Sequence, residues 1–234
     1  MNELPRPWRL MMGVASGVLL LFLGWAVWTL PEQAVGVGPL VHDRLDESGV
    51  ANPVTAALLN FRAMDTLLEL VVLVVALIGA WSLQVRQTEP LSHPPGPVLD
   101  AFARWLIPAM VLMGGYLLWA GAEQTGGAFQ AGAVLGAAGV LWILVHGHLT
   151  KPSQRQLLRV AFVLGLIVFI GVGLATMAMN REFLDYPPGA AKTLIVIIET
   201  GSTISIALLL IGLFAGSQRG MEGELAPGSE EGDE

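Results

Sequence analysis

The chain has 234 residues, of which 54% are hydrophobic and only 13% are charged, and it contains no cysteine. Soluble domains are about one quarter charged, so this composition excludes an ordinary soluble protein and predicts an all-α, polytopic membrane protein. The lack of cysteine excludes disulfides and thiolate metal sites, and no basic patch indicates binding to nucleic acid.

The net charge of −7 is concentrated at the end of the chain. Residues 217–234 contain six acidic residues and one arginine, a net charge of −5, so the rest of the chain carries only −2. We expect this polar, glycine-rich tail to be disordered.

Apolar runs separated by proline, glycine and charged residues predict six transmembrane helices. In chain order these are Leu10–Leu30, Val54–Leu83, Ala101–Gly121, Ala128–Val145, Leu157–Met179 and Ala190–Ala215. Most basic residues fall on one side of these spans, which we predict to be the cytoplasmic side, together with both termini. They are Arg6, Arg9, Arg86, Arg104, Lys151, Arg155, Arg159 and Arg219.

Two connecting segments carry further signals. Residues 41–50 read as a short surface helix ending at Gly49, and Asn52-Pro53 is a typical start for the second span. The proline-rich stretch Arg86–Pro97 cannot form regular structure. It predicts a boundary between a two-helix module, residues 1–95, and a four-helix domain, residues 96–216.

The second predicted span contains three charged residues, Arg62, Asp65 and Glu69. Their spacings of three, four and seven residues place them on one face of a helix. If that helix starts near Val54, the two acids lie near the middle of the membrane. A charge at the centre of a lipid-exposed helix costs about 2.5–3.5 kcal/mol, so this face is expected to meet protein or water.

The sixth predicted span contains Lys192 and Glu199, seven residues apart. Lys192 is near the end of the span and can extend its ammonium group to the membrane surface. Glu199 lies deeper, about a third to halfway through the membrane, and therefore needs a partner or a proton.

Glycines mark a turn and a packing face. Gly126 and Gly127 permit a sharp turn between the third and fourth spans. Gly132 and Gly136 then give the fourth span a small-residue face that allows close helix packing.

The sequence contains no lipase, zinc-protease or P-loop motif, so we expect neither catalytic activity nor a metal or cofactor. Two interpretations of the intramembrane charges stay open. Asp65, Glu69, Glu199 and Lys192 form part of an ion or proton route with Arg62 as electrostatic partner, or the charges only hold helices in register.

The stretch Asn52–Ala80 resembles a segment of Mrp-type multisubunit sodium/proton antiporters. There it belongs to the C-terminal extension of the large A subunit, and in membrane-bound hydrogenases its equivalent is a separate small subunit. The matching positions are Asn52, Val54, Asn60, Phe61, Arg62, Ala63, Asp65, Thr66 and Glu69.

The region from about Leu99 to Phe214 resembles the MnhB domain, the B subunit of the same antiporters. The glycine-rich turn of that family appears here as residues 125–132, TGGAFQAG, with its proline and third glycine replaced. Glu199 stands at the family's acidic position near the chain end.

This resemblance implies a multi-pass subunit of a hetero-oligomeric complex in a bacterial or archaeal cytoplasmic membrane, in contact with lipid and contributing to a route for H⁺ and possibly Na⁺. The alternative is a purely structural assembly subunit of a related complex, such as a hydrogenase membrane arm or an inorganic carbon uptake complex.

Overall fold

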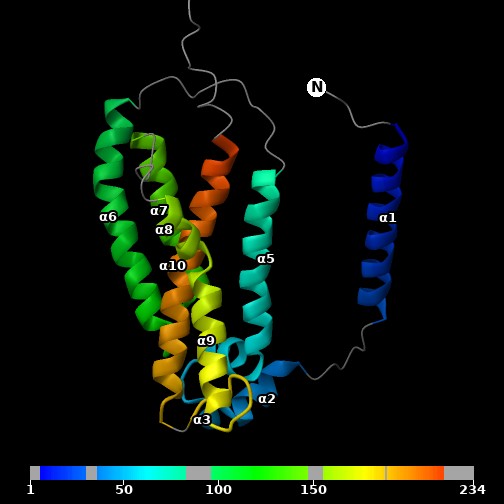
Figure 1. Ribbon diagram of the computed structural model, residues 1–234, viewed down its shortest axis with the longest axis vertical. Coiled ribbons are helices and arrows are strands. Elements are labelled where there is room, and N and C mark those ends of the chain that lie inside the picture. Colours follow the sequence, from blue (N-terminus) through cyan, green and yellow to red (C-terminus); the bar gives the residue numbers. More distant parts are fainter. Residues whose placement is uncertain (1–5, 30–35, 83–95, 147–154, 188, 219–234) are drawn as a thin grey trace, which may run out of the picture. The chain divides into compact units, whose positions relative to one another are not determined.

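The computed structural model describes residues 6–29, 36–82, 96–146, 155–187 and 189–218, and the described residues form helices joined by short turns (Figure 1). The chain divides into two units, residues 1–40 and 41–234. The first two residues of the predicted disordered tail, 217 and 218, are instead the end of the final helix, and the rest of the tail lies outside the described residues.

The first unit is dominated by α1, Arg6–Trp28. Its described apolar side chains are largely exposed within the unit; Trp28, for example, is 89% exposed. The predicted span Leu10–Leu30 is therefore a helix, although it starts earlier and its last residues lie outside the described range or in a turn. The hydroxyl of Thr29 caps the end by donating to the carbonyls of Trp25 and Ala26.

Short helices precede the second predicted span. They are α2, Val37–Asp43, α3, Leu45–Ser48, and α4, Pro53–Ala56. The predicted helix end is confirmed, because α3 stops at Gly49, which has the left-handed φ of 77°. The predicted start is also confirmed: the side chain of Asn52 accepts a hydrogen bond from the Val54 N–H at 3.0 Å, and Pro53 begins α4.

The second span is not the single helix Val54–Leu83 that the sequence predicts. A π-helical turn, η1, covers Ala57–Phe61, and the regular helix α5 begins only at Ala63 and runs to Ser82. Arg62 lies between them with φ −129° and ψ 35°, outside the helical region. No local signal marks this interruption, because none of these residues is glycine or proline.

Hydrogen bonds from side chains stabilise the interrupted segment. The hydroxyl of Thr66 donates to the carbonyl of Leu58 at 2.7 Å, and the hydroxyl of Tyr186 donates to the carbonyl of Leu59 at 2.7 Å. The amide of Asn60 donates to the carbonyl of Ser48 at 3.1 Å. Burial raises the pKa of Tyr186 above its usual value, so its hydroxyl stays protonated and remains a donor.

The remaining helices are α6, Pro97–Ala120; α7, Ala128–His146; α8, Arg155–Phe162; α9, Leu164–Ala178; and α10, Ala191–Gln218. The fifth predicted span, Leu157–Met179, is therefore interrupted at Val163, which has φ −101° and ψ 5°. At this interruption the hydroxyl of Ser205 on α10 donates to the carbonyl of Phe162.

Four helices among the described residues are long and apolar enough to cross a membrane: Ala63–Ser82, Pro97–Ala120, Ala128–His146 and Ala191–Ala215. Two further apolar helices, Gly13–Trp28 and Leu164–Ala178, are shorter. Each belongs to one of the six predicted spans, and the all-helical, multi-pass architecture is confirmed. The two interruptions explain why the second and fifth regular helices are shorter than predicted.

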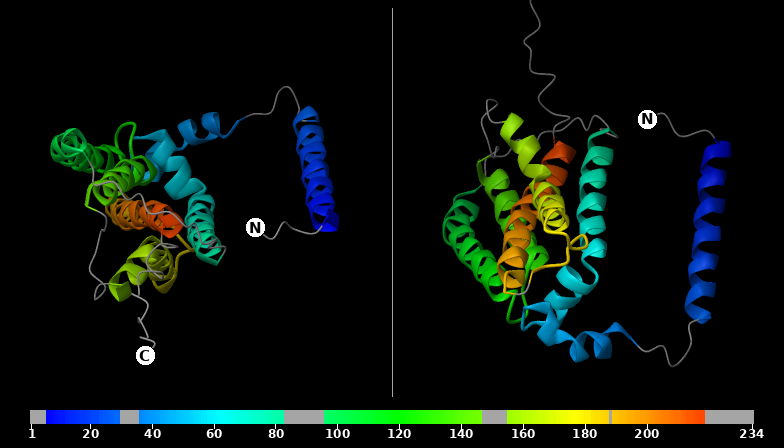
Figure 2. Two further views of the ribbon diagram at one scale, coloured as in Figure 1. Left: turned by 90° about the horizontal axis from the view of Figure 1, so that it is seen from above. Right: turned by 60° about the horizontal axis from the view of Figure 1, so that its bottom comes forward.

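Helix α10 is at the centre of the second unit and packs against α7, α9 and α5 (Figures 1 and 2). Within its apolar window 61% of residues are buried, whereas in α6 only 11% are. The peripheral helices therefore present their apolar side chains to lipid or to neighbouring proteins, and α10 supplies the interior.

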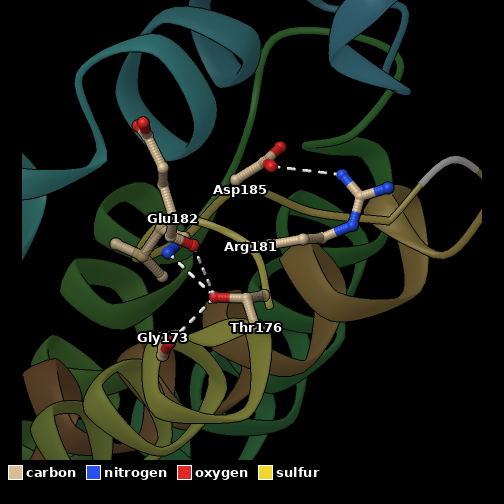
Figure 3. A network of polar contacts seen from close by, with 6 residues as sticks. Gly173, Thr176, Arg181, Glu182 and Asp185 are labelled. Atoms are coloured by element: carbon tan, nitrogen blue, oxygen red, sulfur yellow. Dashed lines mark hydrogen bonds and ion pairs between the residues drawn. The ribbon is translucent and has the colours of Figure 1, made fainter. Parts of the chain in front are cut away.

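Different segments lie at the two ends of the second unit. In Figure 1 the C-terminal ends of α5 and α10 and the N-terminal end of α6 are at one end, and α3 and the α9–α10 loop are at the opposite end. The Thr176 hydroxyl, near the end of α9, lies 2.8 Å from the Gly173 carbonyl and 3.1 Å from the Glu182 carbonyl in that loop, and it accepts the Leu184 N–H at 3.0 Å (Figure 3). This network orders the segment that carries Tyr186 to the interrupted helix.

Replacing Thr66 with valine is expected to destabilise the protein by about 1 kcal/mol, the typical net value of a buried hydrogen bond. Valine has the shape of threonine but cannot donate to the Leu58 carbonyl. Thermal denaturation of the protein purified in detergent measures this loss. Thr200→Val is the matched control, because the Thr200 hydroxyl is exposed on α10; equal melting temperatures for the two variants would contradict the role of Thr66.

Candidate functional site

The buried carboxyl group of Glu199 is the centre of the candidate site. Glu199 lies on α10 and is only 2% exposed. The carboxyl group accepts a hydrogen bond from the backbone N–H of Ala128, the first residue of α7. Because Oε2 has no partner among the described residues, the acceptor is Oε1. The carboxyl group therefore faces the positive end of the α7 helix dipole, a position that favours negative charge.

A glycine-rich turn covers this carboxyl group. A Cβ atom added at Gly121 or Gly127 would come within 3.1 or 3.0 Å of Glu199 Oε1. Gly127 also has a φ of +116°, a conformation that side-chain-bearing residues rarely adopt. Glycine at these positions lets the backbone approach the carboxyl group directly.

Gly126, the other predicted turn residue, allows a second close approach. A Cβ there would collide with the Leu117 carbonyl oxygen. The same carbonyl accepts the N–H of Gly127 at 3.0 Å. This contact ties the turn back onto the last part of α6.

Residues from the first part of the chain hold the turn from the other side. The side-chain amide of Asn52 donates to the carbonyls of Gly121 and Gln124, and the hydroxyl of Thr55 donates to that of Gly121 at 2.5 Å. The backbone N–H groups of Ala51 and Asn52 both lie 3.2 Å from the Ala122 carbonyl. The sequence marked Asn52 only as a helix start; its contact with Gly121, 69 residues away, had no local signal.

Lys192 is placed at the outer end of the site rather than beside Glu199. Its ammonium group contacts Glu123 in the turn at 2.6 Å, and both side chains are more than half exposed. The hydrogen bond and the charge of Lys192 lower the pKa of Glu123, so this contact is a surface ion pair between the turn and the start of α10.

The charged residues of the second span are arranged differently from the sequence prediction. Arg62 and Asp65 form an ion pair, with side chains 55% and 44% exposed. Because α5 starts at Ala63, Asp65 lies in its first turn and Glu69 only about 9 Å from its start, so they are not at the middle of a longer helix.

Glu69 is exposed on α5 and forms no hydrogen bond or ion pair with any residue that the structure describes. Nor does a hydrogen bond or ion pair link Asp65 to Glu199 within the described ranges. The structure thus pairs Arg62 with Asp65, leaves Glu69 outside this ion pair on the same helix, and buries Glu199 in a different environment.

The predicted small-residue face of α7 packs against α10. A Cβ added at Gly132 would come within 2.7 Å of Ile206, and one at Gly136 within 3.1 Å of Leu210. These close contacts fix α10, and therefore Glu199, against the beginning of α7. No group of three or more potential metal ligands occurs among the described residues.

The apolar helices and the buried carboxyl group under a glycine-rich turn define the class of this protein. It is a multi-pass membrane protein with polar groups inside its helix bundle. Comparison with protein families is more specific. Residues 98–220 match the model of the domain related to the MnhB subunit of Na⁺/H⁺ antiporters, and residues 5–93 match the MbhE family, the E subunit of MBH. The chain belongs to the MnhB-domain family.

Two relatives show how this chain compares in length. A probable A/B subunit of a K⁺/H⁺ antiporter from Rhizobium meliloti (strain 1021) is 22% identical in an alignment of 203 residues that covers 75% of this chain and 20% of the relative. An uncharacterized protein of Methanocaldococcus jannaschii is 27% identical in an alignment of 157 residues that covers 58% of this chain and 60% of the relative. This chain therefore spans one fifth of the first relative and less than two thirds of the second.

Two solved structures share the fold. A chain of the Mrp complex from Dietzia sp. DQ12-45-1b has a TM-score of 0.64 and 25% identity, covering 96% of this chain and 27% of that chain. A chain of the membrane-bound sulfane sulfur reductase, an archaeal respiratory membrane complex, has a TM-score of 0.68 and 25% identity, covering 89% and 97%. Both are parts of larger membrane complexes.

Replacing Gly127 with alanine is expected to destabilise the protein by about 1–3 kcal/mol, because alanine is strained at positive φ and its Cβ meets Glu199 Oε1. Thermal denaturation in detergent measures the effect. Gly115→Ala on α6 is the control, because a Cβ there meets nothing within 4 Å in this chain. If both variants melt at the wild-type temperature, the turn does not depend on glycine.

Proposed function

We propose that the chain is a membrane subunit of an Mrp-type cation/proton antiporter complex, and that it contributes to the proton or sodium route and to assembly. Its place in the MnhB-domain family supports an antiporter role rather than a catalytic one. Its similarity to chains of the Mrp complex and of an archaeal respiratory complex supports a location in a bacterial or archaeal cytoplasmic membrane, among other subunits.

The observation that carries the proposal is the buried carboxyl group of Glu199. Glu199 is 2% exposed inside a membrane span, and burying a carboxyl group there costs free energy. An apolar side chain at this position would pack without that cost, so packing alone does not account for the glutamate. Intramembrane acids of this kind commonly bind or relay protons and cations. The N-terminus of α7 then provides a fixed electrostatic partner for the charged form.

Asp65 and Glu69 are assigned to the same route at a different place. Glu69 is exposed on a transmembrane helix, although a charged side chain facing lipid is costly. We therefore place this face of α5 against another protein of the complex, with Arg62 neutralising Asp65 beside it. On this view the ion route lies between subunits at α5, and Glu199 is a second polar station inside this chain.

The alternative function is that of a purely structural subunit, in a hydrogenase-like, sulfur-reducing or carbon-uptake complex. Two contacts favour it: the Arg62–Asp65 ion pair needs no transported ion, and Asn52 and Thr55 already join the two halves of the chain through the turn at Gly121. In that case the same charges orient helices during assembly.

Ion-driven proton flux in inverted membrane vesicles containing the whole complex tests the proposal. We expect Glu199→Gln and Glu69→Gln each to reduce flux by about a hundredfold or more, the scale on which removing a positioned proton-transfer group slows a reaction. Glutamine keeps the size of the side chain but cannot carry the proton or the charge. A native gel shows whether each variant still assembles into the complex.

Glu182→Gln is the matched control, because Glu182 lies in the exposed α9–α10 loop and its side chain extends away from the Thr176 network (Figure 3). This variant is expected to transport like the wild type. Normal flux in the Glu69 and Glu199 variants would make this chain a scaffold, and failure of those variants to assemble would favour the structural alternative.

A further inference from the structure

Two buried side-chain atoms in the middle of α10 have no hydrogen-bond partner among the residues that the structure describes: Oε2 of Glu199 and Oγ of Ser202. Glu199 is 2% exposed and Ser202 is fully buried. Buried polar atoms in native proteins nearly always have a partner, either in the protein or in an ordered water molecule. A pair of such atoms therefore points to a ligand.

The two atoms belong to neighbouring residues on the helix surface. Residues three apart lie on adjacent turns, with a rise of about 4.5 Å between them. Oε1 of Glu199 is already bonded to the α7 N-terminus, which leaves Oε2 as the free acceptor. On the other side, α9 comes very close to α10, because a Cβ at Gly165 would lie 3.1 Å from the Ser202 Cα.

The polar row continues beyond Ser202. Ser205, three residues further along α10, is also buried and donates to the Phe162 carbonyl at the α8–α9 interruption. Glu199, Ser202 and Ser205 thus lead from the glycine-rich turn at one end of α7 to the interrupted helix on the other side of α10. Of the two serines, Ser205 has a hydrogen-bond partner, whereas the hydroxyl of Ser202 has none among the described residues.

The chemistry at this position favours water over a cation. A buried water needs two or more polar partners, and a carboxylate oxygen with a serine hydroxyl provides an acceptor and a group that both donates and accepts. A sodium ion prefers several oxygen ligands and no positive charge nearby. Here the positive end of the α7 dipole faces the same carboxyl group and opposes cation binding.

We propose that a buried water molecule bridges Oε2 of Glu199 and Oγ of Ser202 and connects this carboxyl group to the polar row leading to Ser205. The water site itself is inferred only from the two buried atoms of this chain that have no partner among the described residues. As a step for proton movement it rests on the proposed function, and it gives Glu199 a partner through which a proton can leave toward the α8–α9 interruption.

Cryo-electron microscopy of the assembled complex, at a resolution that shows ordered water, tests the site directly. We expect density within hydrogen-bond distance of both atoms in the wild type, in sodium-free potassium buffer as well as in sodium buffer. Ser202→Ala is expected to abolish that density. Thr200→Val is the matched control on the same helix, because the Thr200 hydroxyl is exposed and bonds to Val196 at 2.7 Å.

Density that disappears without sodium would assign the site to a cation and overturn the proposal. A direct hydrogen bond between Glu199 and Ser202, with no density between them, would also overturn it. Thermal denaturation gives an independent result: Ser202→Ala is expected to lower the melting temperature by removing a partner of the water. A higher melting temperature would show that the hydroxyl is simply unsatisfied.

Proton flux separates this inference from the proposed function. Bridging density with normal flux in Glu199→Gln would keep the water site but remove its role in transport. No bridging density, together with lost flux in Glu199→Gln, would keep the proposed function and reject the water site.

Discussion

The hydrocarbon part of a membrane offers no water to the polar groups of a helix, so each irregularity in a membrane helix needs a partner from the protein. This constraint governs the second unit. At η1 the hydroxyls of Thr66 and Tyr186 donate to backbone carbonyls, and at Val163 Ser205 performs the same role for Phe162. Thr66 lies on α5 itself, but Tyr186 in the α9–α10 loop and Ser205 on α10 are distant in the sequence from the carbonyls that they bind. Each interruption therefore links distant segments and helps to fix how the bundle packs around α10.

The sequence predicted the parts of the fold that depend on composition and local signals. Hydropathy located the six apolar segments, glycine located the end of α3, and Asn52-Pro53 located the start of α4. The interruptions at Arg62 and Val163 could not be predicted, because neither contains a helix-breaking residue and both depend on donors elsewhere in the chain. As a result the two acids of the second span lie near the start of α5 and not in the middle of one continuous helix.

The candidate site shows the same division between local and long-range information. Glu199 stood out as an acid in an apolar span, and Gly126 and Gly127 as a turn, but their meeting over one carboxyl group depends on α7 packing against α10. Lys192 has a suitable helical spacing to face Glu199, yet its long side chain reaches the exposed Glu123 instead. The cost of desolvation explains this arrangement, since an ammonium group loses less hydration at the exposed end of the helix than beside a buried acid.

The hydrogen bonds from Asn52 and Thr55 to the turn at Gly121 have a consequence for how such modules evolve. The two regions on either side of the linker match different family models, so equivalent parts can exist as separate proteins. Helix α5 also packs against α10 and α9, but helix packing within a membrane gains little from the hydrophobic effect. Joining the partners in one chain gives each an effective concentration in the millimolar range, set by the linker, and fixes their stoichiometry at one to one. Gene fusion can therefore substitute for contact area.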